Sequence, residues 1–206
     1  MKIQVDDAHG VSALLVAPPR PAACLVLAHG AGAGMTHPFM AAVAEGLLER
    51  QVATLRFQFP SMEAGSKRPD RPPLAQATVR AAVNAARARL PRVPLFAGGK
   101  SFGGRMTSQA QAEAPLPDVA GLIFLGFPLH PAGKPSADRA DHLTRISVRC
   151  CFSREHATPS PTWRTCGRRS RSWETMRRWS CRTRPITAST FRRSLAGRTP
   201  RFSMSC

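Results

Sequence analysis

The feature that most constrains the fold of this chain is a glycine-rich turn between two segments of different periodicity. An apolar run at 93–97 (VPLFA) enters the turn GGKSFGG, and a run typical of a helix, 105–114 (RMTSQAQAEA), leaves it. This order predicts a strand, a tight turn and a helix. Gly99, Ser101 and Gly103 give the turn the spacing G-x-S-x-G. A serine in a strained backbone conformation needs neighbours without a Cβ two residues to either side, and this spacing supplies them.

The same pattern, set between a strand and a helix, is typical of the nucleophile elbow of α/β-hydrolases. Such a turn holds the Ser101 hydroxyl clear of the sheet and directs the N–H of Phe102 to where an oxyanion would form. The alternative is a glycine-rich turn with an incidental serine. The flanking strand and helix favour the elbow.

Strand-like and helix-like segments alternate as far as residue 148. The sequence predicts an opening hairpin (2–5 and 12–17), strands at 23–28, 53–59, 93–97 and 119–126, and a last strand beginning at 146–148. Helices are predicted from Pro38, over 74–90, over 105–114 and, as a short helix, over 136–143. A polar surface loop is predicted at 60–73. This alternation favours an α/β fold with a doubly wound, mostly parallel sheet. Glycine-rich turns follow two of the strands, at the edge where open parallel sheets place their sites.

The second glycine-rich turn, 29–35 (HGAGAGM), follows the apolar strand at 23–28. Three glycines in five residues let the backbone approach a ligand and expose its N–H groups. A phosphate-binding loop is the alternative, but the spacing G-x-G-x-x-G is not met and no Lys-Ser/Thr pair of a P-loop follows. His29 and His37 are interpreted as loop structure.

Four segments in order resemble a small α/β-hydrolase family: HGAGAGMTHPFM (29–40), GGKSFGGRM (98–106), GFPLHPAGKP (126–135) and DHLTRISV (141–148). The family is related to dienelactone hydrolases and similar to the hydrolase-like domain of testis-expressed and non-specific-lethal-complex proteins. The resemblance covers about residues 1–148, and these segments together are far more specific than G-x-S-x-G alone.

The resemblance implies a serine nucleophile, an oxyanion hole and a nucleophile elbow. The residues at these positions are Ser101 (nucleophile), Ala31, Gly32 and Phe102 (oxyanion hole), and Gly99 and Gly103 (elbow). It also implies a triad in the order Ser, Asp or Glu, His, with the acid after the strand that starts at Ile146 and the His in a loop near the C-terminus. No cofactor and no metal are expected. The usual inference for the family is hydrolysis of a small-molecule ester or thioester, although some relatives are non-catalytic scaffolds.

The length of 206 residues suits one domain with a sizeable core. Residues 1–7 lack the apolar region of a signal peptide and no run approaches a membrane span, so we expect a cytoplasmic protein without membrane contact. The net charge of +18 would ordinarily indicate a nucleic-acid binder. However, residues 1–148 hold 16 Lys+Arg and 10 Asp+Glu (+6), whereas residues 149–206 hold 14 Arg and 2 Glu (+12). The sequence does not indicate an oligomeric state.

Residues 149–206 depart from the family, so we divide the chain into a truncated hydrolase core at 1–148 and a basic tail predicted to be disordered. The tail has little apolar periodicity and no Lys, and it holds all three Trp and five of the six Cys. One interpretation is that its Arg and Trp residues bind nucleic acid. A Cys metal site is disfavoured, because the gaps between Cys151, Cys166, Cys181 and Cys206 match no ligand spacing.

A third interpretation is that the tail is translated out of frame. Shifting the reading frame by two bases, with GC-rich codon choices, lets 150–168 encode an apolar strand, a turn with an Asp and the start of a helix. The codons for 185–192 then encode Asp-His-Gly-Phe-His-Val-Pro, which resembles the family's His loop. The Asp would span the codons of Ala157 and Thr158, and the His those of Ile186 and Thr187. Both missing triad members thus fall in the expected order, and this is the hypothesis we favour.

The favoured function is a serine hydrolase that acts on an ester or related acyl substrate through Ser101 and is impaired in this chain, because a serine without a general base is a weak nucleophile. His130 and His142 are weaker candidates for that base. The alternative function is a non-catalytic hydrolase-fold scaffold whose basic tail binds nucleic acid or an acidic partner. Neither the substrate nor a ligand signature in the 60–73 loop is readable from the sequence.

Overall fold

The computed structural model of this chain describes residues 1–66, 68–127 and 141–153, which fall in one compact unit, Met1–Arg154. The predictions made for 128–140 and 154–206 lie outside the described residues. They include His130, residues 136–140 of the helix predicted at 136–143, the basic tail beyond 153 and both out-of-frame triad positions.

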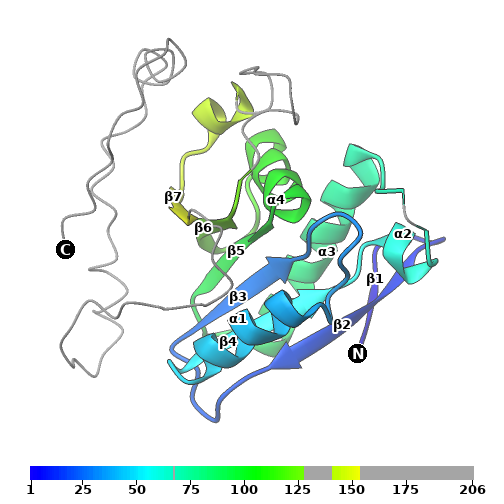
Figure 1. Ribbon diagram of the computed structural model, residues 1–206. Helices are drawn as coiled ribbons and strands as arrows, with labels where there is room; N and C mark the ends of the chain where they lie inside the picture. Colours follow the sequence, from blue (N-terminus) through cyan, green and yellow to red (C-terminus); the bar gives the residue numbers. More distant parts are fainter. Residues whose placement is uncertain (67, 128–140, 154–206) are drawn as a thin grey trace. The chain divides into compact units, whose positions relative to one another are not determined.

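A mixed sheet of seven strands runs through the described residues in the order β1-β2-β4-β3-β5-β6-β7 (Figure 1). The strands are β1 (Lys2–Gln4), β2 (Gly10–Val16), β3 (Ala23–Ala28), β4 (Val52–Phe57), β5 (Leu95–Lys100), β6 (Val119–Leu125) and β7 (Arg149–Ser153). Strands β3 to β7 pair in parallel, while β2 pairs antiparallel with both β1 and β4. This confirms the predicted α/β fold with a doubly wound, mostly parallel sheet.

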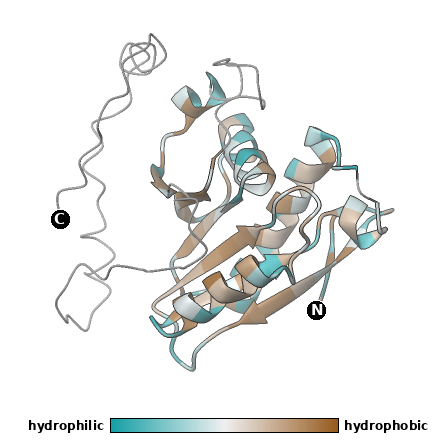
Figure 2. Cartoon of the chain, in the orientation of Figure 1, coloured by the Kyte–Doolittle hydropathy of each residue, from teal (hydrophilic) through white to brown (hydrophobic). Residues whose placement is uncertain are grey.

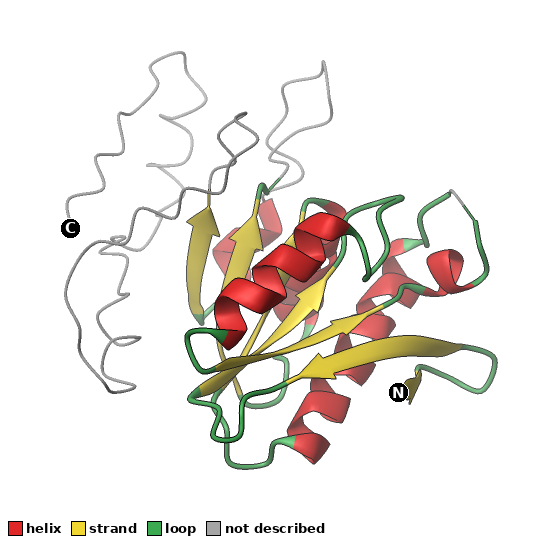
Figure 3. Cartoon of the chain, turned by 60° about the horizontal axis from the view of Figure 1, so that its bottom comes forward, coloured by secondary structure: helices red, strands yellow, loops and turns green. Residues whose placement is uncertain are grey.

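Helices cover both faces of this sheet (Figure 3). They are α1 (Pro38–Leu48), α2 (Pro60–Glu63), α3 (Pro72–Arg89), α4 (Phe102–Glu113) and a 3₁₀ helix, η1 (Asp141–Arg145). The first three each have proline at the first helical position, where a missing N–H costs no helical hydrogen bond. The His37 ring caps α1 by accepting the Phe39 N–H at 3.2 Å, which is a structural role.

The hydrophobic core has two parts, one on each face of the sheet. Alternate residues of β4, among them Leu55 and Phe57, pack with the apolar stripes of α3 and α4. On the opposite face Leu25 and Leu27 of β3 pack with Met40 of α1. Strand β3 is apolar along its whole length (Figure 2), and the carboxyl ends of β3 and β5 are held side by side.

Three boundaries differ from the sequence prediction, and the first two have a clear physical reason. The strand predicted to reach 59 ends at Phe57, and α2 begins within the predicted loop, because Pro60 can open a helix but cannot donate to a strand ladder. β5 continues through two glycines to Lys100, because their missing side chains let the neighbouring backbones approach. The last strand is Arg149–Ser153, so the sheet extends past residue 148.

Candidate active site

The backbone of Ser101 is strained where β5 turns into α4. Its φ is 48° and its ψ is −108°, a region that costs a residue with a side chain on the order of 1–3 kcal/mol. The Ser101 N–H donates to the Leu125 carbonyl at the end of β6 (3.2 Å), and its carbonyl accepts the Arg105 N–H (3.0 Å). Strand and helix therefore fix both sides of this residue. The predicted strand, tight turn and helix are present, with the serine at the carboxyl edge of the sheet.

The two glycines of G-x-S-x-G are required by close contacts between backbones. A Cβ added to Gly99 would lie 2.4 Å from the Ala28 carbonyl oxygen, and one added to Gly103 would lie 2.5 Å from that of His29. Distances below 3.0 Å force the backbone to move. The end of β3 is thus pressed against the turn, and this brings the two glycine-rich turns of the sequence together.

The structure brings the three predicted oxyanion residues to one pocket, which is lined by Ala31, Gly32 and Phe102 among others. Phe102 is the first residue of a twelve-residue helix, whose N-terminal N–H groups lack helical acceptors and carry the positive end of the helix dipole. Gly32 has a φ of +72°, which a glycine adopts without steric cost. The arrangement can stabilise a negative charge beside Ser101.

His29 lies under this pocket, where it is almost fully buried. Its Nδ1 lies 2.8 Å from the Gly30 carbonyl, and its Nε2 accepts the Phe59 N–H at 3.1 Å. Because Nε2 accepts, the ring proton is on Nδ1. Burial lowers the pKa of His29, so the ring stays neutral. Both nitrogens are used, and His29 joins the 29–35 turn to the start of α2 rather than acting as a base.

No imidazole contacts Ser101 within the described residues, and its hydroxyl has no hydrogen-bond partner there. His142 was a candidate base, but its Nε2 lies 2.7 Å from the Ser108 hydroxyl, two turns along α4 from Ser101. Burial, aided by Arg145 and Arg105, lowers the pKa of His142. The interpretation of His142 as the base is therefore wrong. His9 is paired with Asp6 at 2.7 Å in the β1–β2 turn.

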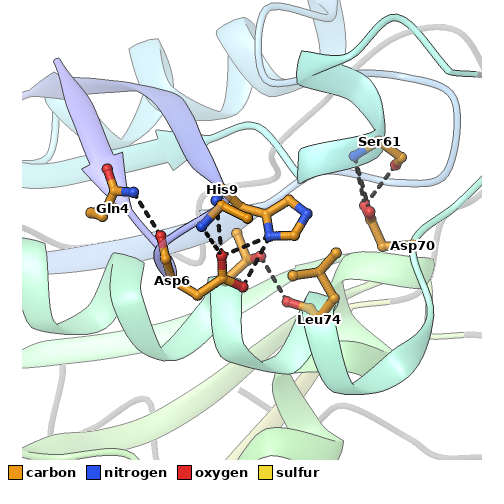
Figure 4. A network of polar contacts seen from close by, with 8 residues as sticks. Gln4, Asp6, His9, Ser61, Asp70 and Leu74 are labelled. Carbon is orange, nitrogen blue, oxygen red and sulfur yellow. Dashed lines mark hydrogen bonds and ion pairs between the residues drawn. The ribbon is translucent and has the colours of Figure 1, made fainter.

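The outer wall of the pocket comes from the segment that follows β4, which sequence reasoning described only as a surface loop near the site. Its lining residues here are Phe59, Ser61, Met62, Ser66, Arg68 and Pro69. Asp70 fixes this loop, because its carboxylate accepts both the N–H (3.0 Å) and the hydroxyl (2.6 Å) of Ser61 (Figure 4). The sequence signal for these residues is weak: a loop after a strand of a parallel sheet lies at the edge that carries the site.

A metal-binding cluster and a membrane-spanning helix are both absent from the described residues. No group of three or more His, Cys, Asp or Glu residues in 1–66, 68–127 and 141–153 is placed to hold a metal ion. No helix described by the structure is both long and apolar enough to cross a membrane.

A strained serine at a sharp turn between strand and helix, on a doubly wound sheet, defines the class of α/β-hydrolases. Residues 21–156 match the family model described as "Alpha/beta hydrolase domain", and the chain belongs to this family. A comparison with curated proteins gives no match.

Several solved structures share the fold of this chain. Est1E of Butyrivibrio proteoclasticus, solved with bound ferulic acid, is 26% identical over 62% of this chain, with a TM-score of 0.55. A serine hydrolase homologue from Coxiella burnetii is 18% identical over 74% of this chain and 71% of its own (TM-score 0.60). Dienelactone hydrolase from Anabaena variabilis is 20% identical over 74% of this chain and 83% of its own (TM-score 0.54). The chain spans about half the length of Est1E (52%).

Proposed function

We propose that this domain is built to hydrolyse esters or related acyl compounds through Ser101, and that the chain as written does so poorly. The observation that carries the proposal is the strained backbone of Ser101 between β5 and α4. Strain of this size persists only where the surrounding structure enforces it, and it is concentrated at functional sites. The bound ferulic acid of Est1E supports an acyl group with an aromatic ring, and here Phe59 and Phe102 line the pocket.

The proposed reaction begins when the Ser101 hydroxyl oxygen attacks the substrate carbonyl carbon and the carbonyl oxygen becomes negatively charged. The N–H of Phe102 and those of Ala31 or Gly32 hold this oxyanion. Collapse of the intermediate breaks the bond to the leaving alcohol, which takes up a proton, and water then releases the acid from the acyl-enzyme. A general base must first remove the proton of the Ser101 hydroxyl, and the described residues offer none.

We attribute the missing base to a shifted reading frame after about residue 148. The family match ends at residue 156, which supports a change in the character of the chain, although the match and strand β7 (Arg149–Ser153) both continue a few residues past 148. Sequencing the coding DNA across the codons for Ile146 to Cys151 tests this directly. A one-base discrepancy that restores the Asp and His loops is the expected result. A confirmed reading frame contradicts it.

Hydrolysis of a neutral aryl ester tests the catalytic part of the proposal. The chain with the restored frame should turn over the ester, and Ser101→Ala should abolish this turnover. The chain as written should be slower by on the order of 10⁴-fold, because removing a triad member has effects of that size. Turnover by the written chain that matches the restored one, or that survives Ser101→Ala, would contradict the proposal.

The second candidate is a non-catalytic scaffold, favoured by the absence of an imidazole beside Ser101 in the described part of the chain. In this case the 14 Arg residues of 149–206 would bind nucleic acid or an acidic partner. Binding through phosphates weakens steeply with added salt. Salt-sensitive retention of RNA or DNA by the chain, lost on deletion of 155–206, together with no Ser101-dependent turnover, is the outcome expected for a scaffold.

A further inference from the structure

An arginine is buried inside the sheet without a carboxylate to pair with. Arg56 lies in β4 opposite Leu27 of β3, so its side chain is on the face of the sheet that α1 covers. Its exposed fraction is only 8%. Within the described residues it forms no ion pair, and its Nε has no hydrogen-bond partner. A buried charge left unpaired weakens a fold, so stability does not explain this residue.

The guanidinium of Arg56 contacts the turn that carries two of the proposed oxyanion donors. Its Nη1 donates to the carbonyl of Met35, the last residue of the 29–35 turn, at 3.3 Å. Gln58 lies two residues further along and so points to the same side of the chain as Arg56. Its Oε1 accepts the Met35 N–H at 2.7 Å. Both backbone groups of Met35 are therefore bonded to side chains from the end of β4.

The same segment also holds the first residue of the turn, because the His29 Nε2 accepts the Phe59 N–H at 3.1 Å. Residues 56–59 therefore hold the turn at both of its ends. This segment is itself well anchored: β4 pairs with β2 and β3, and the Gln58 N–H donates to the Ser12 carbonyl at 2.8 Å. Side chains placed on a paired strand hold their contacts more precisely than side chains on a loop.

Between its two ends the turn is bonded weakly. The Ala33 N–H donates to the Gly30 carbonyl at 3.3 Å, which is long for a hydrogen bond between backbone groups. Gly32 and Gly34 both have positive φ values, +72° and +66°, and glycine has wide conformational freedom. The positions of the N–H groups inside the turn therefore depend on how firmly its ends are held.

We propose that Arg56 and Gln58 are positioning residues, which hold the 29–35 turn so that the N–H of Ala31 or Gly32 faces the oxyanion formed at Ser101. This inference rests on the proposed function of Ser101. Donors stabilise a transition state only when they are in place before the charge develops, so a small displacement of the turn lowers the rate more than it weakens substrate binding. The buried charge of Arg56 then serves the site rather than the stability of the sheet.

Amide hydrogen exchange tests whether the two side chains hold the turn, and it requires no turnover. In the full chain as written, Arg56→Met removes the donor to the Met35 carbonyl, and Gln58→Met removes the acceptor of the Met35 N–H with little change in volume. Each should speed exchange in peptides covering 29–37 by about tenfold, the effect of losing one such hydrogen bond, and leave peptides from β2 and β6 unchanged. Arg56→Lys keeps a charge and a donor, so it should restore most of the protection.

The matched control is Arg80→Met. The Arg80 guanidinium also donates to backbone carbonyls, those of Ala110 and Ala114, but these lie at the end of α4 far from Ser101. This variant should leave exchange in 29–37 unchanged. Gln58→Met, which alters no charge, decides the question should Arg56→Met not fold. Protection of 29–37 that is unchanged in Gln58→Met, or that is lost equally in Arg80→Met, would overturn the proposal.

Ester turnover tests whether the held turn serves catalysis. In the chain with the restored frame, Arg56→Met and Gln58→Met should each lower kcat by about tenfold to a hundredfold, less than the loss of an oxyanion donor itself, and leave KM for the neutral aryl ester within about twofold. Arg56→Lys should recover most of kcat. A purely structural role would reduce the amount of folded enzyme without changing kcat per folded molecule, and that result would contradict the positioning role.

The two measurements separate this inference from the proposed function. If exchange in the turn depends on Arg56 and Gln58 but no ester is hydrolysed in a Ser101-dependent way, the two side chains hold the turn and the hydrolase proposal fails, together with the catalytic purpose of the contacts. If Ser101-dependent turnover is present and neither variant changes kcat, the hydrolase proposal stands and the positioning role is wrong.

Discussion

Two glycine-rich turns meet at the carboxyl edge of the sheet, and their glycines are required for different reasons. In the elbow the requirement is space: a Cβ on Gly98 would lie 1.8 Å from the Ile123 carbonyl oxygen. In the 29–35 turn the requirement is conformation: Gly32 has a φ of +72° but no atom within 4 Å of an added Cβ. Glycine is therefore needed for close backbone packing in the elbow and for a left-handed backbone conformation in the 29–35 turn.

The largest effect should come from filling the crowded turn. Gly98→Ala places a methyl group against the backbone of β6, which has no flexible side chain to yield, so we expect a loss of about 4 kcal/mol or more in the free energy of unfolding. Urea denaturation measures this loss. The control is Gly46→Ala in α1, where the nearest atom is the end of the Arg50 side chain at 3.8 Å; it should gain about 1 kcal/mol. Similar values for the two variants would contradict the packing argument.

Ser101 differs from the glycines around it in the elbow, because it keeps a side chain although its φ is positive. Ser101→Gly should relieve the strain and raise the free energy of unfolding by about 1 kcal/mol, after allowance for the greater entropy of glycine in the unfolded chain. Ser101→Ala keeps a Cβ and therefore the strain, so its stability should match the parent. A Ser101→Gly variant no more stable than Ser101→Ala would show that the turn is relaxed.

The elbow was predictable because its chemistry is local. The strained serine needs neighbours without a Cβ two residues to either side, and Gly99 and Gly103 meet this need within a single turn of the chain, so the spacing alone indicates it. The proposed oxyanion residues Ala31 and Gly32 came from the family resemblance, which assigns that role to the loop after β3. Ala31, Gly32 and Phe102 line one pocket because β3 and β5 are neighbours in the sheet. The alternation of strands and helices predicted a parallel sheet but not this strand order.

Contacts distant in sequence were not predictable. The bond between His29 and Phe59 joins residues 30 apart, and nothing near either residue identifies the other. Asp70 and Ser61 fix the pocket wall through their hydrogen bonds, but nothing in the sequence distinguishes them from other polar residues of the same loop. The end of the sheet was placed too early for a different reason: Cys150, Cys151 and Phe152 still pair with β6, and the family match also continues past 148, to residue 156.

The His29 ring links the 29–35 turn to the start of α2, and its titration should weaken that link. Its folded pKa lies below the ordinary value of 6.5, so as the pH falls the unfolded chain takes up the proton first. The stability present above about pH 6.5 should be lost between that pH and the folded pKa.

His142 acts in the same direction, because its pKa is also lowered. Urea denaturation at a series of pH values, for the parent, His29→Gln and His142→Gln, separates the two. Each substitution should flatten the slope of stability below pH 6.5. A slope unchanged in His29→Gln would mean that His29 is charged or exposed in the folded chain.

The smallest effect on stability is expected in the open turn. Gly32→Ala meets no atom, so its cost is only that of a side chain in the left-handed region, about 1 kcal/mol. Gly65→Ala is the matched control, because Gly65 also has a φ of +72° and open space around it but does not line the pocket. The two variants should lose equal stability in urea, and only Gly32→Ala should reduce Ser101-dependent ester turnover of the frame-restored chain, since it disturbs a proposed oxyanion donor. Equal turnover in both variants would remove Gly32 from the oxyanion hole and leave Phe102 and Ala31 as its donors.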